Sequence, residues 1–403
     1  MEAIQLKSRG GVLTVDFDNS HCRKCGTCTK ACPSLLNFNR VLPQQVDTIG
    51  RIETIFFGYA TDEDVRCHAA SGGTATSLLL YMLRRRIVDR VLVVRMNKFT
   101  VTSCLTCDPD DVISAQGSVY FKTFSLSLLR KILSSIKKGE RICIVGLPCQ
   151  ISGLKRVLGH FNDRLYFLGL ICNHVNELWF LEYLFQRFLP DNSNPLAIGS
   201  RKDGWPGGIK ILFTLGHGST QEVSVPLYDF WRPLPSLGIS APLGCSMCAD
   251  HFATMADVVV GDAWHPKFTE KSSLGVSVVI TRTIKGRKLV ESAVEDKQLS
   301  AEKAKLADLF VTHGTNIVEG SQYAPFKQKL LRHNVSAVKE LWEMDKSIIA
   351  VLTFASHSVL KHRRIRRLLS QHLTERVLYR TLWYLWRYEL IRLSRIVKGL
   401  AES

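Results

Sequence analysis

Residues 141–172, RICIVGLPCQISGLKRVLGHFNDRLYFLGLIC, contain two apolar runs separated by a helical pattern. Residues 141–145 and 165–171 are rich in branched and aromatic side chains, which is typical of buried strands. Between them, a Gly-Leu-Pro turn leads into a helix that we expect to begin at Cys149 and to end near Leu158. Strand, helix and strand at this spacing predict a parallel crossover.

The alternation of strands and helices continues on both sides of this stretch. Basic residues close a helix predicted over residues 72–86, and a strand follows over 90–95. Further along, the pattern predicts a β-hairpin over 210–225, strands over 257–260 and 276–281, and a helix over 288–295. The core is therefore expected to be α/β or α+β, which periodicity alone does not distinguish. After residue 304 the chain reads as helical to its end.

Composition restricts the kind of protein. The chain has 403 residues, of which 46% are hydrophobic and 22% are charged, as expected of a globular protein with a sizeable core. Its net charge is +17, and residues 361–403 hold eleven basic and three acidic residues, so nearly half of the excess lies in one segment. The remaining chain is only mildly basic, which argues against a nucleic-acid clamp.

The cysteines point to an intracellular redox or metal protein. We find neither a signal-peptide pattern at the N-terminus nor an apolar run of about 18 residues, and therefore expect a cytoplasmic location. Twelve cysteines without a secretion signal favour metal or redox chemistry over a disulfide framework.

Cys22, Cys25, Cys28 and Cys32 form the pattern C-x2-C-x2-C-x3-C-P, the spacing of bacterial ferredoxins. We call these four cysteines the N-terminal set. The run occurs once, and in two-cluster ferredoxins its fourth cysteine serves the other cluster, so the fourth ligand stays open. Cys32 is the first choice; the alternatives are Cys67, Cys104 and Cys107. A zinc site is the competing interpretation, although zinc sites usually pair two distant C-x2-C units.

A second group, the core set, consists of Cys149, Cys172, Cys245 and Cys248. If the strands before Cys149 and Cys172 are parallel neighbours, both cysteines lie at the carboxyl edge of the sheet, where α/β proteins bind ligands. A helix N-terminus also favours the Cys149 thiolate. The loop with Cys245 and Cys248 could then complete a second cubane site. The alternative is that Cys149 and Cys172 are ordinary buried cysteines, as we expect for Cys143.

Several motifs occur in a recognisable order. They are Ser71-Gly72-Gly73-Thr74 opening a helix, Gly117-Ser118-Val119-Tyr120, Gly146-Leu147-Pro148-Cys149-Gln150, Gly204-Trp205-Pro206-Gly207, and Cys245-x2-Cys248 before Ala256-Asp257-x3-Gly261-Asp262. The series resembles the coenzyme F-420 hydrogenase/dehydrogenase beta-subunit family over residues 22–281.

The resemblance implies that the protein binds FAD and one or two [4Fe-4S] clusters. It also implies a reaction that connects the transfer of single electrons to the transfer of a hydride. In that family the core set matches the core-cluster positions. The implied organisation is a ferredoxin-like [4Fe-4S] segment (1–48), an N-terminal flavoprotein domain (49–130), a C-terminal catalytic domain with the core cluster (131–304) and a helical basic extension (305–403).

The flavin site is predicted at Ser71, Gly72, Gly73 and Thr74, whose backbone amides at a helix N-terminus suit a phosphate. Helices also begin this way without a ligand. His68 is a candidate proton donor, and Trp205 and Tyr120 are candidates to stack on a ring, although a structural role is the alternative for each.

The tail over residues 361–398 mixes arginines with Leu, Ile, Trp and Tyr in an amphipathic helical pattern. Such a helix suits the inner membrane surface or a protein partner, and packing on its own domain is an equal alternative. Nucleic acid is a weaker option.

The sequence supports three hypotheses about function. The leading hypothesis is a reductase in which electrons enter at the N-terminal set from a donor such as ferredoxin. They reach FAD through the core set and leave as hydride to coenzyme F-420 or a small organic substrate. The second is an electron-transfer subunit that works with a partner redox subunit of a larger hydrogenase or dehydrogenase. The third, from another class, is a zinc-stapled nucleic-acid-binding protein.

Overall fold

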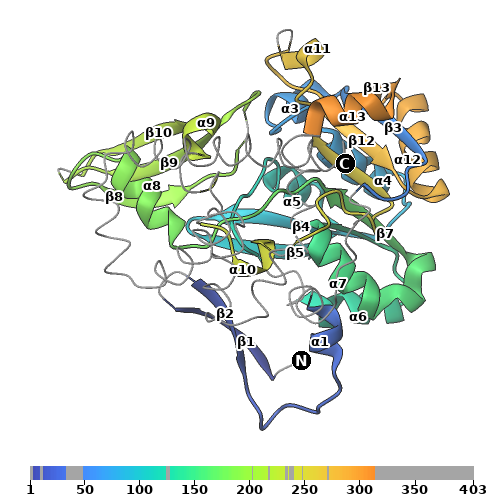
Figure 1. The fold of residues 1–403 in the computed structure, drawn as a ribbon, viewed down its shortest axis with the longest axis horizontal. Helices are drawn as coiled ribbons and strands as arrows, with labels where there is room; N and C mark the ends of the chain where they lie inside the picture. Colours follow the sequence, from blue (N-terminus) through green and yellow to red (C-terminus); the bar gives the residue numbers. More distant parts are fainter. Residues whose placement is uncertain are drawn as a thin grey trace, which may run out of the picture.

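A large mixed sheet forms the centre of the molecule in the computed structural model (Figure 1), which describes residues 3–9, 12–32, 49–123, 128–201, 203–216, 218–231, 235, 240–246, 248–269 and 272–313. Its strand order is β13-β3-β12-β11-β7-β6-β4-β5. The strands are β3 (Thr54–Ala60), β4 (Arg90–Asn97), β5 (Thr100–Thr106), β6 (Ile142–Gly146), β7 (Leu165–Leu170), β11 (Val258–Asp262), β12 (Ser277–Thr281) and β13 (Leu299–Ala304).

The middle of this sheet is parallel and its flanks are antiparallel. Strands β4, β6, β7 and β11 run in one direction, and α7 (Pro148–Leu158) connects β6 to β7. The predicted parallel crossover is therefore confirmed, with Gly146 opposite Gly169. Strands β5, β12 and β13 pair antiparallel to their neighbours. A mixed sheet of this kind explains why periodicity left α/β and α+β open.

Helices cover both faces of the large sheet. One face packs against α6 (Leu129–Lys137), α7 and α13 (Leu306–His313). The other packs against α4 (Thr74–Arg84), α5 (Pro109–Ser114) and α12 (Ile284–Glu295). Alternate residues of β6 enter the two cores, since Ile142 and Ile144 face α7 whereas Cys143 faces the α4 side. Cys143 is thus a buried core residue, as expected.

A smaller sheet lies beside the large one (Figure 1). It has the order β10-β9-β8, with strands β8 (Asn194–Ile198), β9 (Gly208–Thr214) and β10 (Thr220–Pro226). The antiparallel pairing of β9 with β10 confirms the predicted hairpin. Its core also contains α8 (Phe180–Phe188) and α9 (Leu227–Phe230). Residues 118 and 121 bridge to Arg201 and Asn176, so the segment between α5 and α6 ties the two sheets together.

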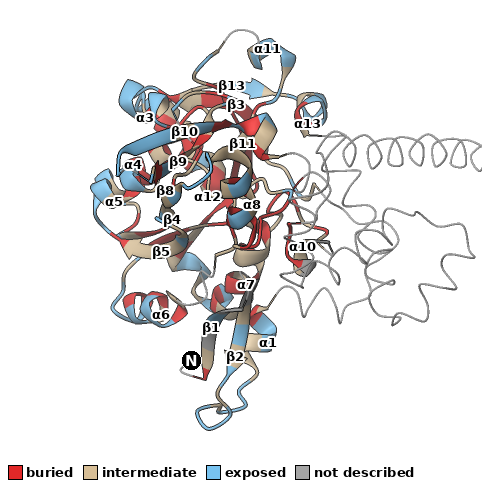
Figure 2. Cartoon of the chain, turned by 90° about the vertical axis from the view of Figure 1, so that its left-hand side faces the viewer, coloured by how far each residue is buried: buried red, intermediate tan, exposed pale blue. Residues whose placement is uncertain are grey.

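The N-terminal segment begins with a β-hairpin that the sequence did not predict, formed by β1 (Ile4–Arg9) and β2 (Val12–Phe17). The short helix α1 (Thr27–Ala31) then packs against α7 (Figure 2). Residues 33–48 lie outside the described part. The segment contacts the body through α1, and its ferredoxin-like character stays a prediction.

Short elements complete the described chain: α3 (Glu63–Cys67), the 3-10 helix η2 (Gly159–Arg164), α10 (Leu243–Ser246) and α11 (Pro266–Thr269). No helix in the described ranges is both long and apolar enough to cross a membrane. The helical prediction after residue 304 holds through α13, and the predicted amphipathic tail over 361–398 lies outside the described residues. Both predicted domains, 49–130 and 131–304, contribute strands to the large sheet, and the boundary between them stays a prediction.

Candidate functional site

Five strands of the large sheet point their carboxyl ends at the same edge. Strands β4, β6, β7 and β11 are parallel, and β3 shares their direction because β12 pairs antiparallel with both β11 and β3. Ligands of α/β proteins bind at this edge, outside the carboxyl ends of the strands. We call it the carboxyl edge, and the candidate site lies along it.

Cys149 and Cys172 both reach the carboxyl edge from neighbouring strands. Cys149 lies in the first turn of α7, where the Gln150 side chain accepts a hydrogen bond of 2.9 Å from the Leu147 amide. Cys172 follows β7, and its amide donates to the carbonyl of His251 at 3.0 Å. The His251 imidazole Nδ1 lies 2.8 Å from the Cys172 carbonyl oxygen. Two contacts therefore join Cys172 to His251.

The loop that follows the small sheet brings the other two cysteines to the same place. Cys245 lies in α10, and the Cys248 amide donates to the Cys245 carbonyl at 3.1 Å. The Cys248 thiol lies 3.2 Å from the carbonyl oxygen of Asp250. The Asp250 carboxylate in turn accepts from the amide and hydroxyl of Thr254, both at 3.1 Å, which anchors the loop ahead of β11.

The four thiols of the core set are close enough to influence one another. Burial raises the pKa of each thiol above its ordinary value, and for Cys172 the other three thiols raise it further. For Cys149, burial and the adjacent Cys245 raise the pKa to about 12. Four thiols that oppose one another's ionisation suit a cationic centre, because iron or zinc would favour the thiolates.

An ion pair that the sequence did not reveal lies near Cys245. The Lys122 ammonium is 3.1 Å from a carboxylate oxygen of Glu177, whose side chain is only 8% exposed. Lys122 acts to lower the pKa of Cys245 and Glu177 acts to raise it, although burial is the larger effect. No sequence signal joins these residues, since they lie 55 positions apart.

The core set supplies four thiols, the number that a cubane iron–sulfur cluster needs. In the described ranges, no three or more thiol, imidazole or carboxylate groups are arranged to hold a metal ion. The predicted assignment of Cys149, Cys172, Cys245 and Cys248 as ligands therefore rests on their meeting at one edge, and it stays a proposal.

The N-terminal set has a different environment. Cys25 is exposed, and the other three cysteines are partly exposed. Hydrogen bonds from the hydroxyl and amide of Thr27 lower the pKa of Cys25, and the Thr27 hydroxyl lies 3.3 Å from its sulfur. Cys28 and Cys32 are one helical turn apart at α1, with an amide-to-carbonyl bond of 3.0 Å. Their role as cluster ligands remains a prediction.

The predicted phosphate loop is tied to the carboxyl edge. The Ser71 hydroxyl donates to the Val276 carbonyl at 2.9 Å, and the Thr74 hydroxyl donates to the Gly58 carbonyl at 3.2 Å. Gly72 has a φ of +50°, and a Cβ there would lie 2.8 Å from the Ser277 amide nitrogen. Packing against β12 and β3 thus explains Gly72 and both hydroxyls. The amides of Gly72 and Gly73 already donate to the carbonyls of Leu274 and Ser71, and phosphate binding by this loop stays a prediction.

The other predicted flavin-site residues differ in burial. His68 is exposed at the end of α3, and its Nδ1 lies 2.9 Å from the Asp64 carbonyl oxygen. Its role as a proton donor stays a prediction. Trp205 is 8% exposed and packs on Trp264, with ring centroids 4.7 Å apart. Tyr120 packs against Phe230 and Trp231 of the small-sheet core.

A buried ion pair stands at the end of β11, between the core set and the phosphate loop in strand order. Arg201, 1% exposed, donates two hydrogen bonds of 2.8 Å each to the Asp262 carboxylate. Tyr120 lies beside this pair and beside Cys172, and burial raises the pKa of Tyr120 to about 12. Asp262 ends one of the motifs noted in the sequence, but nothing in the sequence paired it with Arg201.

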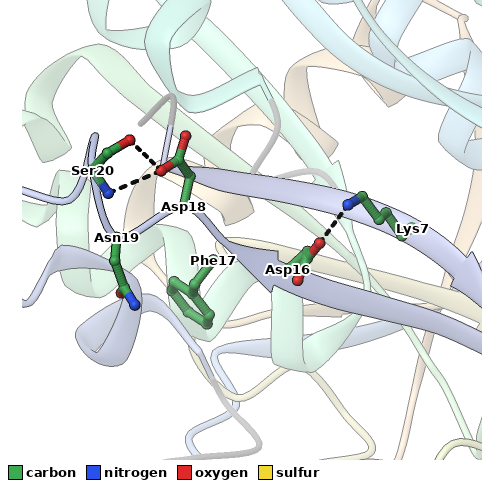
Figure 3. Close-up of a pocket in the computed structure, with 6 residues that line it drawn as sticks. All are labelled: Lys7, Asp16, Phe17, Asp18, Asn19 and Ser20. Carbon is green, nitrogen blue, oxygen red and sulfur yellow. Dashed lines mark hydrogen bonds and ion pairs between the residues drawn. The ribbon is translucent and has the colours of Figure 1, made fainter.

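The hollow drawn in Figure 3 lies elsewhere, on the N-terminal hairpin. It has a volume of about 440 Å³ and is lined by Lys7, Asp16, Phe17, Asp18, Asn19 and Ser20. The Lys7 ammonium forms an ion pair of 2.5 Å with Asp16. Hydrogen bonds from Ser20 and His21 lower the pKa of Asp18. None of the predicted site residues lines this hollow.

The fold defines the class: an α/β protein with a mixed sheet, whose candidate site lies at the carboxyl ends of the parallel strands. Two sequence models of the family described as "Coenzyme F420 hydrogenase/dehydrogenase, beta subunit" match the chain. The model of the family's N-terminal part matches residues 55–130, and the model of its C-terminal part matches residues 139–306. The chain belongs to this family, which confirms the resemblance seen in the sequence.

Individual relatives are distant. A coenzyme F-420-dependent sulfite reductase of Methanocaldococcus jannaschii is 25% identical over 324 residues, covering 70% of this chain and 47% of the relative. The chain thus spans about half of that protein. The coenzyme F-420 hydrogenase subunit beta of Methanothermobacter thermautotrophicus is 26% identical, covering 61% of this chain and 83% of the relative.

A similar fold occurs in a solved structure. One chain of the F-420-reducing [NiFe] hydrogenase complex from Methanosarcina barkeri superposes with a TM-score of 0.53 at 21% sequence identity. The similarity covers 72% of this chain and 97% of that chain. The shared fold agrees with the mixed sheet and helices described above.

Proposed function

We propose that this chain is an iron–sulfur flavoprotein oxidoreductase. It would pass electrons between [4Fe-4S] clusters and FAD, and hydride to or from coenzyme F-420 or a small organic substrate. The observation that carries this proposal is the convergence of Cys149, Cys172, Cys245 and Cys248, from three segments of the chain, at the carboxyl edge of the sheet. The names of the family and of its F-420-linked relatives support the oxidoreductase class.

The chain's own residues would have distinct tasks. The core set would hold one cluster, and the N-terminal set would hold the other. When bound, the clusters carry single electrons and the flavin exchanges a hydride, so together they connect the two kinds of transfer. The contact of α1 with α7, the helix whose first turn contains Cys149, supports electron entry at the N-terminal set.

At the other end of the site, the loop of residues 71–74 at the start of α4 would receive the FAD phosphates. The hydroxyls of Ser71 and Thr74 hold the loop against β12 and β3, which would keep the start of α4 in place at the carboxyl edge. A helix N-terminus is favourable for a phosphate group because its amides and dipole both attract an anion.

A second candidate is an electron-transfer beta subunit of a larger hydrogenase or dehydrogenase. It is favoured by the relatives named as subunits and by the similar chain within a hydrogenase complex. A partner redox subunit would then take the place of a soluble donor such as ferredoxin. Native mass spectrometry of the protein purified from its own cells would distinguish the two, since a stand-alone reductase should be recovered without other redox subunits.

The proposed location is the cytoplasm. Contact with the inner membrane surface through residues 361–398 is part of this proposal, and it would be tested by sedimentation with vesicles of anionic lipid. Binding that falls as salt rises would support it, because the segment is strongly basic.

The experiment that tests the main proposal is a full cofactor analysis after purification without oxygen. Iron, sulfide, zinc and released flavin are measured on one sample together with the visible spectrum. About eight irons and one FAD per chain are expected, with four irons for each cubane. About four irons would leave one cysteine set without a cluster. Zinc without iron or flavin would overturn the oxidoreductase proposal in favour of the zinc-stapled protein.

A further inference from the structure

Arg201 and Trp205 both lie at the carboxyl edge, and each is held by contacts with other residues at this edge. Arg201 is bonded to Asp262 at the end of β11. Trp205 packs on Trp264, two residues beyond Asp262, and its backbone amide donates to the Ser273 carbonyl at 2.7 Å. Both residues therefore lie near the end of β11, which stands between β7 and β12 in the sheet.

Trp205 also reaches the phosphate loop. A Cβ at Gly275 would lie 2.8 Å from Cγ of Trp205 and 3.0 Å from the Ser71 hydroxyl oxygen. The Arg66 guanidinium donates to the Gly275 carbonyl at 3.3 Å. Arg66, Ser71 and Trp205 thus surround one glycine at the carboxyl edge, next to the start of α4.

Three buried donors in this region have no hydrogen-bond partner among the described residues: Nε of Arg66, Nε of Arg201 and Nε1 of Trp205. Arg201 and Trp205 are 1% and 8% exposed, so ordinary solvent contact does not satisfy them. A buried donor without an acceptor is unfavourable, and native structures rarely retain one unless a ligand, ion or water supplies the acceptor. All three groups can only donate, so the missing partner must carry acceptors.

A purely structural role explains part of this arrangement. The Arg201–Asp262 ion pair joins the small sheet to the large one, which accounts for the two Nη bonds of Arg201. It does not account for the unused Nε of Arg201 or for the indole nitrogen of Trp205. Neither does it explain why Trp264, whose ring packs on Trp205, remains 37% exposed at this edge.

We propose that Arg201 and Trp205, together with Arg66, recognise the carbonyl and ring-nitrogen acceptors of an isoalloxazine-type ring bound at the carboxyl edge. This inference rests on the proposed function and adds its ring-binding residues. A planar ring suits the site because the Trp205–Trp264 pair offers aromatic surface. The ring can belong to the resident flavin or to a soluble deazaflavin such as coenzyme F-420, since both present the same kind of acceptors.

The decisive variant is Trp205→Phe, which removes the indole N–H and keeps an aromatic ring. The matched control is Trp179→Phe, a buried tryptophan in the small-sheet core that is also 8% exposed. Full-length proteins are purified without oxygen, and their iron content serves as the test of correct folding. In the first arm, FAD is titrated into deflavinated protein; in the second, coenzyme F-420 is titrated into flavin-loaded protein.

Trp205→Phe should weaken ring binding about tenfold in at least one arm, because an acceptor loses its buried donor. Trp179→Phe should bind as the wild type does. Weaker binding of FAD in the first arm would show that the donors serve the resident flavin. Weaker binding of coenzyme F-420 in the second arm would show that they serve the deazaflavin. A second variant, Arg66→Met, removes another donor without altering the tryptophan pair and should weaken the same arm.

The opposite result is equally clear. If the wild type binds a ring and both Trp205→Phe and Arg66→Met bind it with unchanged affinity, the inference is wrong while the proposed function stands. If the wild type binds neither FAD nor coenzyme F-420, the proposed function itself fails.

Discussion

The two cysteine sets differ in how the chain assembles them. The N-terminal set lies within eleven residues, from Cys22 to Cys32, and its spacing is visible in the sequence. The core set spans residues 149–248 and comes together only because β6 and β7 are neighbours and a distant loop returns to them. A ferredoxin-type site can therefore be predicted from spacing, whereas a site at a sheet edge depends on the whole fold.

The environments of the two sets differ in the same way. Hydrogen bonds from Thr27 lower the pKa of the exposed Cys25. Burial raises the pKa of every thiol in the core set. Local hydrogen bonds thus set the pKa of Cys25, whereas tertiary packing sets the pKa of the thiols in the core set. Each prediction below would break or sharpen this contrast.

The largest effect is expected from Arg201→Met, which leaves the Asp262 carboxylate without its buried partner. We expect a loss of about 3–5 kcal/mol in the free energy of unfolding, as for other broken buried ion pairs. Arg95→Met is the matched control: its ion pair with Asp111, at 3.1 Å, is about one-third exposed, and it should cost less than about 1 kcal/mol.

Urea unfolding followed by circular dichroism measures both variants. The core set should lose iron in Arg201→Met, because the pair joins the two sheets beside it. Equal losses of stability in the two variants would show that the carboxyl edge does not depend on this pair.

Next in size is the effect of Cys172→Ser on cofactor content. If the core set holds one of two cubanes, iron per chain should fall by about half while the N-terminal cluster remains. Cys143→Ser is the control, because it places the same substitution in a fully buried position of the neighbouring strand, outside the core set. It should lower the melting temperature and keep all the iron. Equal iron contents in the two variants would remove Cys172 from the ligands.

A smaller effect concerns thiol reactivity in protein stripped of metal. Only the thiolate reacts with iodoacetamide. A thiol with a lowered pKa therefore reacts at a lower pH, and a thiol with a raised pKa reacts only at a higher pH. Cys25 should be alkylated at the lowest pH, whereas Cys149, with a pKa raised to about 12, should react only at a much higher pH. Peptide mass spectrometry over a pH series measures the order. Simultaneous labelling would contradict the contrast between the two sets.

The smallest effect is expected from Thr27→Val, which removes the hydroxyl 3.3 Å from the Cys25 sulfur and keeps the backbone amide. Alkylation of Cys25 near neutral pH should slow by about threefold, because one of the hydrogen bonds that stabilise the thiolate is lost. Thr29→Val is a suitable comparison, since the Thr29 hydroxyl donates to the Gly26 carbonyl instead. If the two variants behave alike, the local hydrogen bond does not control this thiol.

The regular elements were largely predictable from sequence because their signals are local. The pattern around residues 141–172 predicted β6, α7 and β7, and with them the common edge of Cys149 and Cys172. The hairpin of β9 and β10 was predicted as well. The hairpin of β1 and β2 was missed, and packing of Gly72 against Ser277 was not expected because the two lie far apart in the chain.

The sequence by itself determined the family, the alternation of strands and helices, and the spacing of the N-terminal set, since each depends on residues close together in the chain. Tertiary structure alone decided the strand order, the approach of Cys245 and Cys248 to the edge, and the pairing of Arg201 with Asp262 across 61 positions. The physical reason is that a buried charge requires a partner, but local propensity does not specify which distant residue supplies it.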